Sequence, residues 1–131
     1  DNHVPGCDVC GEVVAVGEDV SGFTPGDRVY GCAGGVKGSS GTLCQFLVAD
    51  AELMAHAPHS VSAVQAAVLP LIAITAFEAI ERLNLNAGER CLIMGGSGGV
   101  GQMAQLAALR IFEKSSGEAG AWRYPNLDAG D

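Results

Sequence analysis

The stretch MGGSGGVGQMAQLAALR, residues 94–110, decides the fold of the second half of the chain. Its first half is rich in glycine, and apolar residues at helical spacing follow. The preceding run RCLIMGG, residues 90–96, has the composition of a buried strand. The order of strand, glycine-rich loop and helix, the last over residues 100 to about 110, predicts the opening unit of a doubly wound α/β domain.

The loop itself has the spacing G-x-G-x-x-G over residues 96–101. In this interpretation Gly96 permits a tight turn, Gly98 lets a phosphate approach the backbone, and Gly101 lets the helix pack closely on the strand. Free N–H groups at the start of the helix would point at the anion. The sequence therefore predicts a loop that binds the pyrophosphate of a dinucleotide; a tight structural turn without a ligand is the alternative. The predicted cofactor-binding residues of the loop are Gly96, Ser97, Gly98, Gly99, Val100 and Gly101.

The first 60 residues have the pattern of a β domain. The runs GEVVAVG (residues 11–17), PGDRVYG (25–31), GTLCQFLVAD (41–50) and ELMAHAP (52–58) are strand-like and are separated by glycine and proline. Several short strands of this kind favour a small antiparallel barrel or sandwich. Asp27 is expected to hold the turn in the second run.

Near residue 60 the periodicity becomes helical, and we expect a domain boundary there. Ser60 or Ser62 is a suitable N-cap, and Pro70 is expected to end one helix and to begin the next. A doubly wound domain then requires a second apolar strand after the glycine loop and its helix. Residues 111–131 do not have that pattern, so we interpret them as irregular; a truncated or frame-shifted end is also consistent with their composition.

Composition and charge limit the expected partners. The 131 residues carry a formal net charge of -8, whereas a nucleic-acid partner would require clustered Lys and Arg. No apolar run is expected to reach transmembrane length, and the first residues lack the pattern of a secretory leader, so no membrane partner is expected. An odd number of cysteines, five, favours reduced and buried thiols in a cytoplasmic protein. Cys7 and Cys10 form C-x-x-C, which we interpret as two small packed thiols rather than a redox pair.

Four motifs occur in unbroken order: PGCDVCGEVVAVGEDVSGFTPGDRVYG (residues 5–31), GTLCQFLVAD (41–50), LPLIAITAFEAI (69–80) and GGSGGVG (95–101). Together they resemble the medium-chain dehydrogenase/reductase superfamily, in its zinc-free quinone oxidoreductase branch. The resemblance extends from residue 4 to about residue 110 and corresponds to the middle of the family's length. It implies part of a GroES-like antiparallel barrel over residues 1–60, the start of a Rossmann dinucleotide-binding domain over 61–110, and an irregular divergent tail over 111–131.

The resemblance also implies an activity: NAD(P)H-dependent transfer of hydride from the nicotinamide to a small-molecule quinone or enone. NADPH is the expected cofactor, with NADH as the alternative. The resemblance places the hydroxyl of Thr75 near the nicotinamide, whereas a threonine that bonds back to its own helix is the other interpretation. We assign no catalytic side chain, because cofactor and geometry can carry the reaction. Members of the family are often homo-oligomers.

Zinc is not expected. Zinc members of the family carry His and then Glu where this chain has Cys7 and Asp8, and Cys where it has Leu71. Leucine cannot ligate a metal, and a catalytic zinc needs three protein ligands. The structural-zinc lobe of the family needs four closely spaced cysteines, and the corresponding stretch here holds Cys32 and Cys44. We therefore assign no metal-binding residue.

Two alternatives remain at this point. One is a relative of the zinc-type alcohol dehydrogenases. The other is an inactive piece of an oxidoreductase, and we expect this of the isolated 131 residues, because strands that the family fold requires would be missing and would leave edges unpaired.

Overall fold

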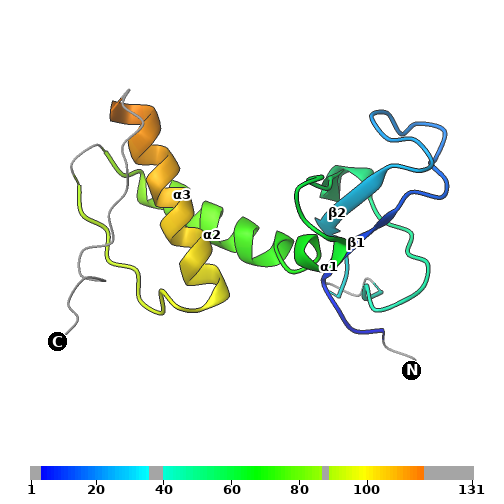
Figure 1. Ribbon diagram of the computed structural model, residues 1–131, viewed down its shortest axis with the longest axis horizontal. Helices are drawn as coiled ribbons and strands as arrows, with labels where there is room; N and C mark the ends of the chain where they lie inside the picture. Colours follow the sequence, from blue (N-terminus) through cyan, green and yellow to red (C-terminus); the bar gives the residue numbers. More distant parts are fainter. Residues whose placement is uncertain (1–3, 36–39, 87–88, 117–131) are drawn as a thin grey trace. The chain divides into compact units, whose positions relative to one another are not determined.

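In a computed structural model, residues 4–35, 40–86 and 89–116 of the chain are described. The chain divides into two compact units, Asp1–Ile74 and Thr75–Asp131. Figure 1 labels the main elements along the chain. The division falls within helix α2 (Pro70–Leu83), later than the boundary expected near residue 60. The assignment of whole domains to residues 1–60 and 61–110 stays a prediction.

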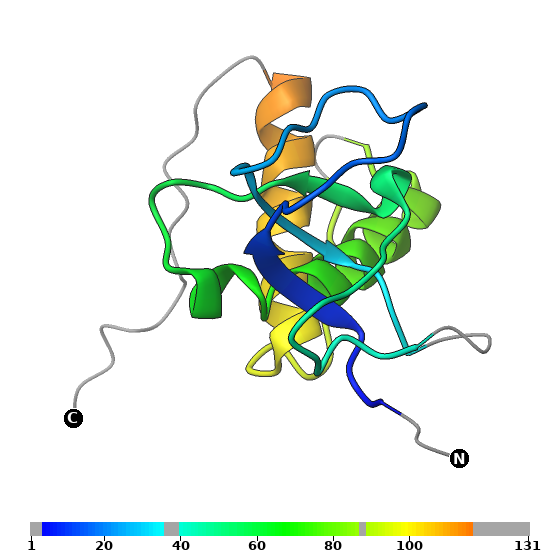
Figure 2. The same ribbon diagram turned by 90° about the vertical axis from the view of Figure 1, so that its right-hand side faces the viewer.

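The first unit is built on a three-stranded antiparallel sheet. Strands β1 (Asp8–Glu12), β2 (Arg28–Cys32) and β3 (Met54–His56) lie in the order β1-β2-β3. Figure 2 shows β1 and β2 side by side. The antiparallel β character predicted for this half is confirmed, but the described residues do not form a closed barrel, because both outer strands keep one unpaired edge.

The predicted strand over residues 41–50 is not formed. Its first residues are held by backbone bonds in which Gly41 N–H donates to the Val4 carbonyl and Thr42 N–H to the Gly6 carbonyl. These bonds go to residues before β1, so the segment is not part of the sheet, and Phe46 and Val48 are 79% and 101% exposed. A run that is apolar on both faces requires cover on both faces to pack as a strand, and the described residues of this unit do not supply it. The segment ends at a short 3-10 helix, η1 (Ala51–Leu53).

The turn before β2 is held by Asp27, as the sequence predicts. Its carboxylate accepts hydrogen bonds from the backbone N–H of Thr24 at 2.7 Å and from the Thr24 hydroxyl at 3.1 Å. The bond from the Thr24 N–H is the main reason why the pKa of Asp27 is lowered from its ordinary value of 3.8.

We expect this carboxylate to make the stability of the first unit depend on pH. Because the pKa is lower in the folded state, the contribution is fully present above the unfolded-state pKa and is lost as the pH falls through the folded-state value. Urea unfolding measured at a series of pH values checks this. In Asp27→Asn the loss of stability on acidification should be smaller than in the original chain. Equal losses in the two chains would show that Asp27 does not contribute.

The two helices that follow begin where the sequence predicts. Helix α1 (Ala63–Ala66) has Ser62 as its N-cap: the Ser62 hydroxyl accepts a bond from Gln65 N–H, and the Gln65 side chain accepts one from Ser62 N–H. Helix α2 begins at Pro70, where the missing N–H of proline costs no helical hydrogen bond. It ends before Asn84, whose φ of 48° is the left-handed conformation common after helices.

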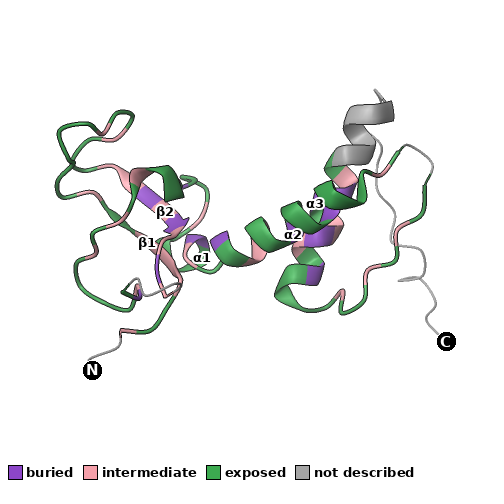
Figure 3. Ribbon diagram, turned by 180° about the vertical axis from the view of Figure 1, so that it is seen from behind, coloured by how far each residue is buried: buried purple, intermediate pink, exposed green. Residues whose placement is uncertain are grey.

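The expectation that no apolar run reaches transmembrane length is wrong for the stretch Ala63–Leu83. Its 21 residues, with a mean hydropathy of 1.9, have the length and composition of a membrane span. These two properties alone are weak evidence, because core helices of soluble proteins share them. In the structure the stretch consists of two helices, α1 and α2, with Pro70 at the start of the second. Part of α2 is buried against α3 (Figure 3).

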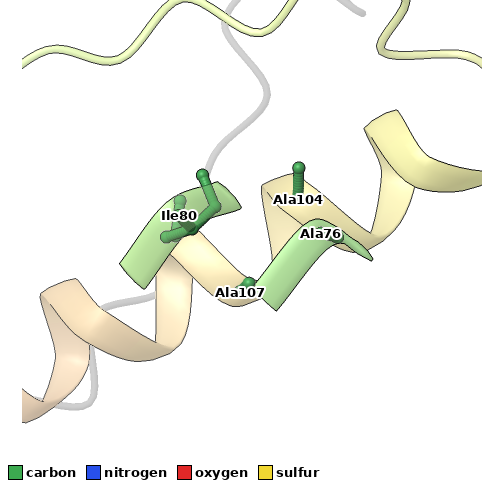
Figure 4. Packing of buried hydrophobic residues seen from close by; sticks show 5 residues of the cluster. Ala76, Ile80, Ala104 and Ala107 are labelled. Atoms are coloured by element: carbon green, nitrogen blue, oxygen red, sulfur yellow. The ribbon is translucent and has the colours of Figure 1, made fainter. Parts of the chain in front are cut away.

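The second unit packs α2 against α3 (Gly99–Ser116) through small side chains. Figure 4 shows Ala76 and Ile80 of α2 facing Ala104 and Ala107 of α3. Alanine at these positions lets the helix backbones approach closely, and Ile80 is the largest buried side chain of the cluster. The half-buried side chains of Cys91, Ile93 and Met103 pack against it.

Two expectations for this unit are wrong. Residues 90–96 do not form a strand, because a strand requires a hydrogen-bonded neighbour and the described residues provide no parallel partner for this run. The predicted Rossmann unit is thus represented here by its loop and helix only. The tail does not become irregular at residue 111, because α3 continues to Ser116; residues 117–131 lie outside the described part of the chain.

Candidate functional site

The glycine-rich loop turns the chain into the start of α3. Gly98 N–H donates to the Gly95 carbonyl at 2.9 Å, and Gln102 N–H donates to the Gly98 carbonyl at 2.9 Å, the first bond of the helical ladder. Gly98 is therefore the N-cap residue, and it has no side chain that could accept a bond from the helix. The N–H groups of Gly99, Val100 and Gly101 have no acceptor within the helix. The helix start predicted after the glycine loop is present, and whether its amides bind an anion stays a prediction.

Two glycines set the shape of this loop. Gly95 has a φ of 71°, the left-handed conformation that favours glycine. The tight turn thus depends on Gly95 and not on Gly96, for which it was predicted. Gly101 is buried, and a Cβ there would lie 2.2 Å from the Gly95 carbonyl oxygen. The close approach predicted for Gly101 exists, but it is to the backbone of the loop rather than to a strand.

Gly98 leaves the outer side of the loop open. A Cβ on this residue would make one ordinary contact, at 3.4 Å from the Gly95 carbonyl oxygen. Ser97, Gly98, Gly99 and Val100 are all exposed. The loop at these residues is therefore accessible from outside, with no side chain at position 98 to cover it.

Two glutamines of α3 bind the loop from the helix side. The Gln102 side-chain amide donates to the Ser97 carbonyl at 2.9 Å. The Gln105 side-chain amide donates to the Gly96 carbonyl at 2.8 Å and to the Gly101 carbonyl at 3.2 Å. Sequence reasoning missed both residues, although two polar side chains three positions apart on an apolar helix directly after the loop were a usable signal.

Thr75 lies on the exposed side of α2, one residue before the buried Ala76. Its proposed place beside a nicotinamide depends on the resemblance, and it stays a prediction.

Asp8 and Leu71, two positions at which this chain differs from zinc relatives, are joined by a hydrogen bond in the first unit. The Asp8 side chain accepts a bond from the backbone N–H of Leu71 at 2.9 Å and thereby caps the first turn of α2. Asp8 also lies opposite Cys32 in the β1–β2 pair. Burial, the charge of Asp8 and a hydrogen bond to it, and the nearby Cys7 raise the pKa of the Cys32 thiol, which favours the protonated and unreactive form.

The described residues contain no group of three or more His, Cys, Asp or Glu side chains arranged to hold a metal ion. All five cysteines are free. Four are half-buried and Cys44 is exposed, so the expectation that the thiols are buried is wrong.

Comparison with known proteins identifies the first part of the chain. Residues 2–59 match the family model described as the alcohol dehydrogenase GroES-like domain. A GroES-like domain in the first part of the chain is thereby confirmed, while its bounds at residues 1 and 60 stay a prediction.

Curated relatives extend the similarity through the glycine loop. The chain is 38% identical over 117 residues to 2-methylene-furan-3-one reductase of Solanum lycopersicum, covering 86% of this chain and 30% of that protein. It is 42% identical over 113 residues to the chloroplastic quinone oxidoreductase QR1 of Triphysaria versicolor, covering 81% and 34%. The chain thus spans about a third of the length of these relatives.

Comparison with solved structures gives the same result, a match to about a third of a longer chain. A crystal structure of an alcohol dehydrogenase superfamily protein from Novosphingobium aromaticivorans is 45% identical, with a TM-score of 0.80, over 83% of this chain and 33% of that one. A mycobacterial protein solved in complex with NADPH is 31% identical, with a TM-score of 0.70, over 84% and 34%.

These relatives are named as oxidoreductases and reductases, so the family is enzymatic. The chain is similar to part of the length of quinone oxidoreductases and related reductases, in agreement with its resemblance to the medium-chain dehydrogenase/reductase superfamily.

Proposed function

We propose that this chain provides the pyrophosphate-binding loop, together with part of the GroES-like domain, of an NAD(P)H-dependent oxidoreductase that reduces a quinone or an enone without zinc. The observation that carries the proposal is the open start of α3: three amides without a helical acceptor lie behind a loop whose Gly98 leaves room for a ligand. Relatives named as a quinone oxidoreductase and an enone-type reductase support the reaction class.

The residues of the loop fit a dinucleotide. The N–H groups of Gly99, Val100 and Gly101 would donate to phosphate oxygens, and the dipole of the 18-residue α3 would favour their negative charge. NADPH, when bound, would supply the hydride. The Thr75 hydroxyl would orient the nicotinamide by a hydrogen bond. The chain's own role is to bind and to position, so no acid or base is assigned to it.

The contacts of Asp8 support the zinc-independent form of the proposal. This carboxylate already binds the backbone of α2 through Leu71 N–H, at the position where zinc relatives carry a glutamate. The Leu71 side chain has no atom that could ligate a metal. In any active preparation, turnover of a quinone should therefore survive treatment with a zinc chelator. Stoichiometric zinc that turnover requires would contradict this part of the proposal.

Titration of the ¹⁵N-labelled chain with NADPH, followed by backbone NMR, tests the cofactor assignment. We expect saturable shifts at the amides of residues 97–101. Because this chain spans a third of its relatives, we expect an affinity no tighter than about 1 mM, equivalent to ~4 kcal/mol. Shifts that are absent, or that are spread over both units without concentration at the loop, would contradict the proposal. Cytoplasmic location and homo-oligomerisation stay predictions.

A further inference from the structure

The side chain of Gln105 connects helix α3 to the glycine loop by hydrogen bonds. Its amide nitrogen lies within hydrogen-bond distance of two carbonyl oxygens, of Gly96 and of Gly101. Both neighbours are acceptors, so the NH₂ end of the side chain must face them, and both of its hydrogens find a partner there. Gln105 is half-buried, which protects these bonds from exchange with water.

The bond to Gly96 fixes one peptide unit of the loop. In a trans peptide the C=O and the following N–H point in opposite directions, and the described residues contain no cis peptide bond. When Gln105 draws the Gly96 carbonyl toward α3, the N–H of Ser97 therefore points away from α3. The next peptide unit is held at both ends, because Gln102 binds the Ser97 carbonyl and Gly98 N–H binds the Gly95 carbonyl.

Gly96 is the residue that makes room for this contact. Its backbone does not adopt a positive φ, so its conformation alone would tolerate alanine. A Cβ on Gly96, however, would lie 2.9 Å from the Gln105 side-chain nitrogen. Glycine at position 96 and glutamine at position 105 thus form a matched pair.

We propose that Gln105 is a positioning residue for the cofactor: it locks the Gly96–Ser97 peptide so that the Ser97 N–H, and not the Gly96 carbonyl oxygen, faces the incoming pyrophosphate. A flip of this peptide rotates ψ of Gly96 and φ of Ser97, and glycine restricts its own backbone torsions less than any other residue. The flipped form would place a carbonyl oxygen against a phosphate and repel it. The identity of the ligand rests on the function proposed above; the lock itself is a property of the free chain.

The test compares Gln105→Met, Gly96→Ala and the double variant with the original chain. Gln105→Met keeps the length of the side chain and removes its donors. We expect each single variant to weaken NADPH binding about tenfold, the equivalent of ~1.4 kcal/mol. The double variant should be no weaker than about the worse single variant, because both changes break the same contact. Gln45→Met, at an exposed position in the first unit, is the matched control and should bind as the original chain does.

A second readout needs no ligand. The chemical shifts of the Gly96 carbonyl carbon and of the Ser97 amide nitrogen should move in Gln105→Met and in Gly96→Ala, and stay in place in Gln45→Met. Unchanged shifts in the first two variants would overturn the lock. Unchanged affinity in Gln105→Met would overturn its role in binding. If the original chain does not bind NADPH, the proposed function fails, and the ligand-free shifts still decide whether the lock exists.

Discussion

Replacing Gly101 with alanine is expected to remove detectable NADPH binding and to lower the free energy of unfolding of the second unit. The added Cβ would lie 2.2 Å from the Gly95 carbonyl oxygen and 2.8 Å from the Gly96 Cα. These are backbone atoms, so no rotation of a side chain relieves the overlap and the loop must move. Overpacking of this kind costs about 1–3 kcal/mol. The displaced loop would also lose the alignment of its amides.

Gly11→Ala is the matched control, because it makes the same chemical change in a strand of the first unit. A Cβ on Gly11 would have no atom within 4 Å, and we expect a change in unfolding free energy within about 0.5 kcal/mol. Urea unfolding and the NADPH titration are measured on both variants. Equal behaviour of the two would show that the close approach at Gly101 does not determine the loop.

Ile80→Ala is expected to have the largest effect on stability. Ile80 is 3% exposed, and the other buried members of its cluster are alanines on α2 and α3. Removal of its larger side chain leaves a cavity that the alanines cannot fill, at a cost of about 2–5 kcal/mol. The urea midpoint of the second unit should fall accordingly, and the packing that supports the glycine loop should weaken with it.

Leu83→Ala provides the comparison on the same helix. Leu83 is 56% exposed, so a similar loss of apolar atoms should cost well under half as much as at Ile80. If both variants lose the same stability, the packing of α2 against α3 is not what stabilises the unit.

Features that depend on neighbours in sequence were predicted well. The Ser62 cap, the start of α2 at Pro70, the turn at Asp27 and the helix after the glycine loop are all local. Each follows from one residue type in contact with atoms only a few positions away, so periodicity and capping chemistry suffice.

Features that depend on distant partners were not predicted. The run over residues 90–96 has a strand's composition but no parallel neighbour among the described residues. The cap that Asp8 places on α2 joins residues 63 positions apart. No sequence pattern specifies such a contact, because it depends on how the sheet lies against the helix.

The candidate site was predicted only in part. The spacing was enough to predict a glycine-rich turn that leads into a helix, but not the role of each glycine, and phosphate binding by the loop stays a prediction. Gly95 takes the left-handed turn, and Gly96 leaves room for Gln105. A glycine pattern indicates positions where a side chain would not fit, but it does not identify the atoms that a side chain would contact.

The most direct test of the central claim, that the loop binds a pyrophosphate, is a pair of NMR titrations on the original chain. ADP carries a pyrophosphate group without the nicotinamide, and adenosine carries neither. We expect ADP to produce saturable shifts at the amides of residues 97–101 and adenosine to leave those amides in place. Equal shifts with the two ligands, or no shifts with ADP, would contradict the account.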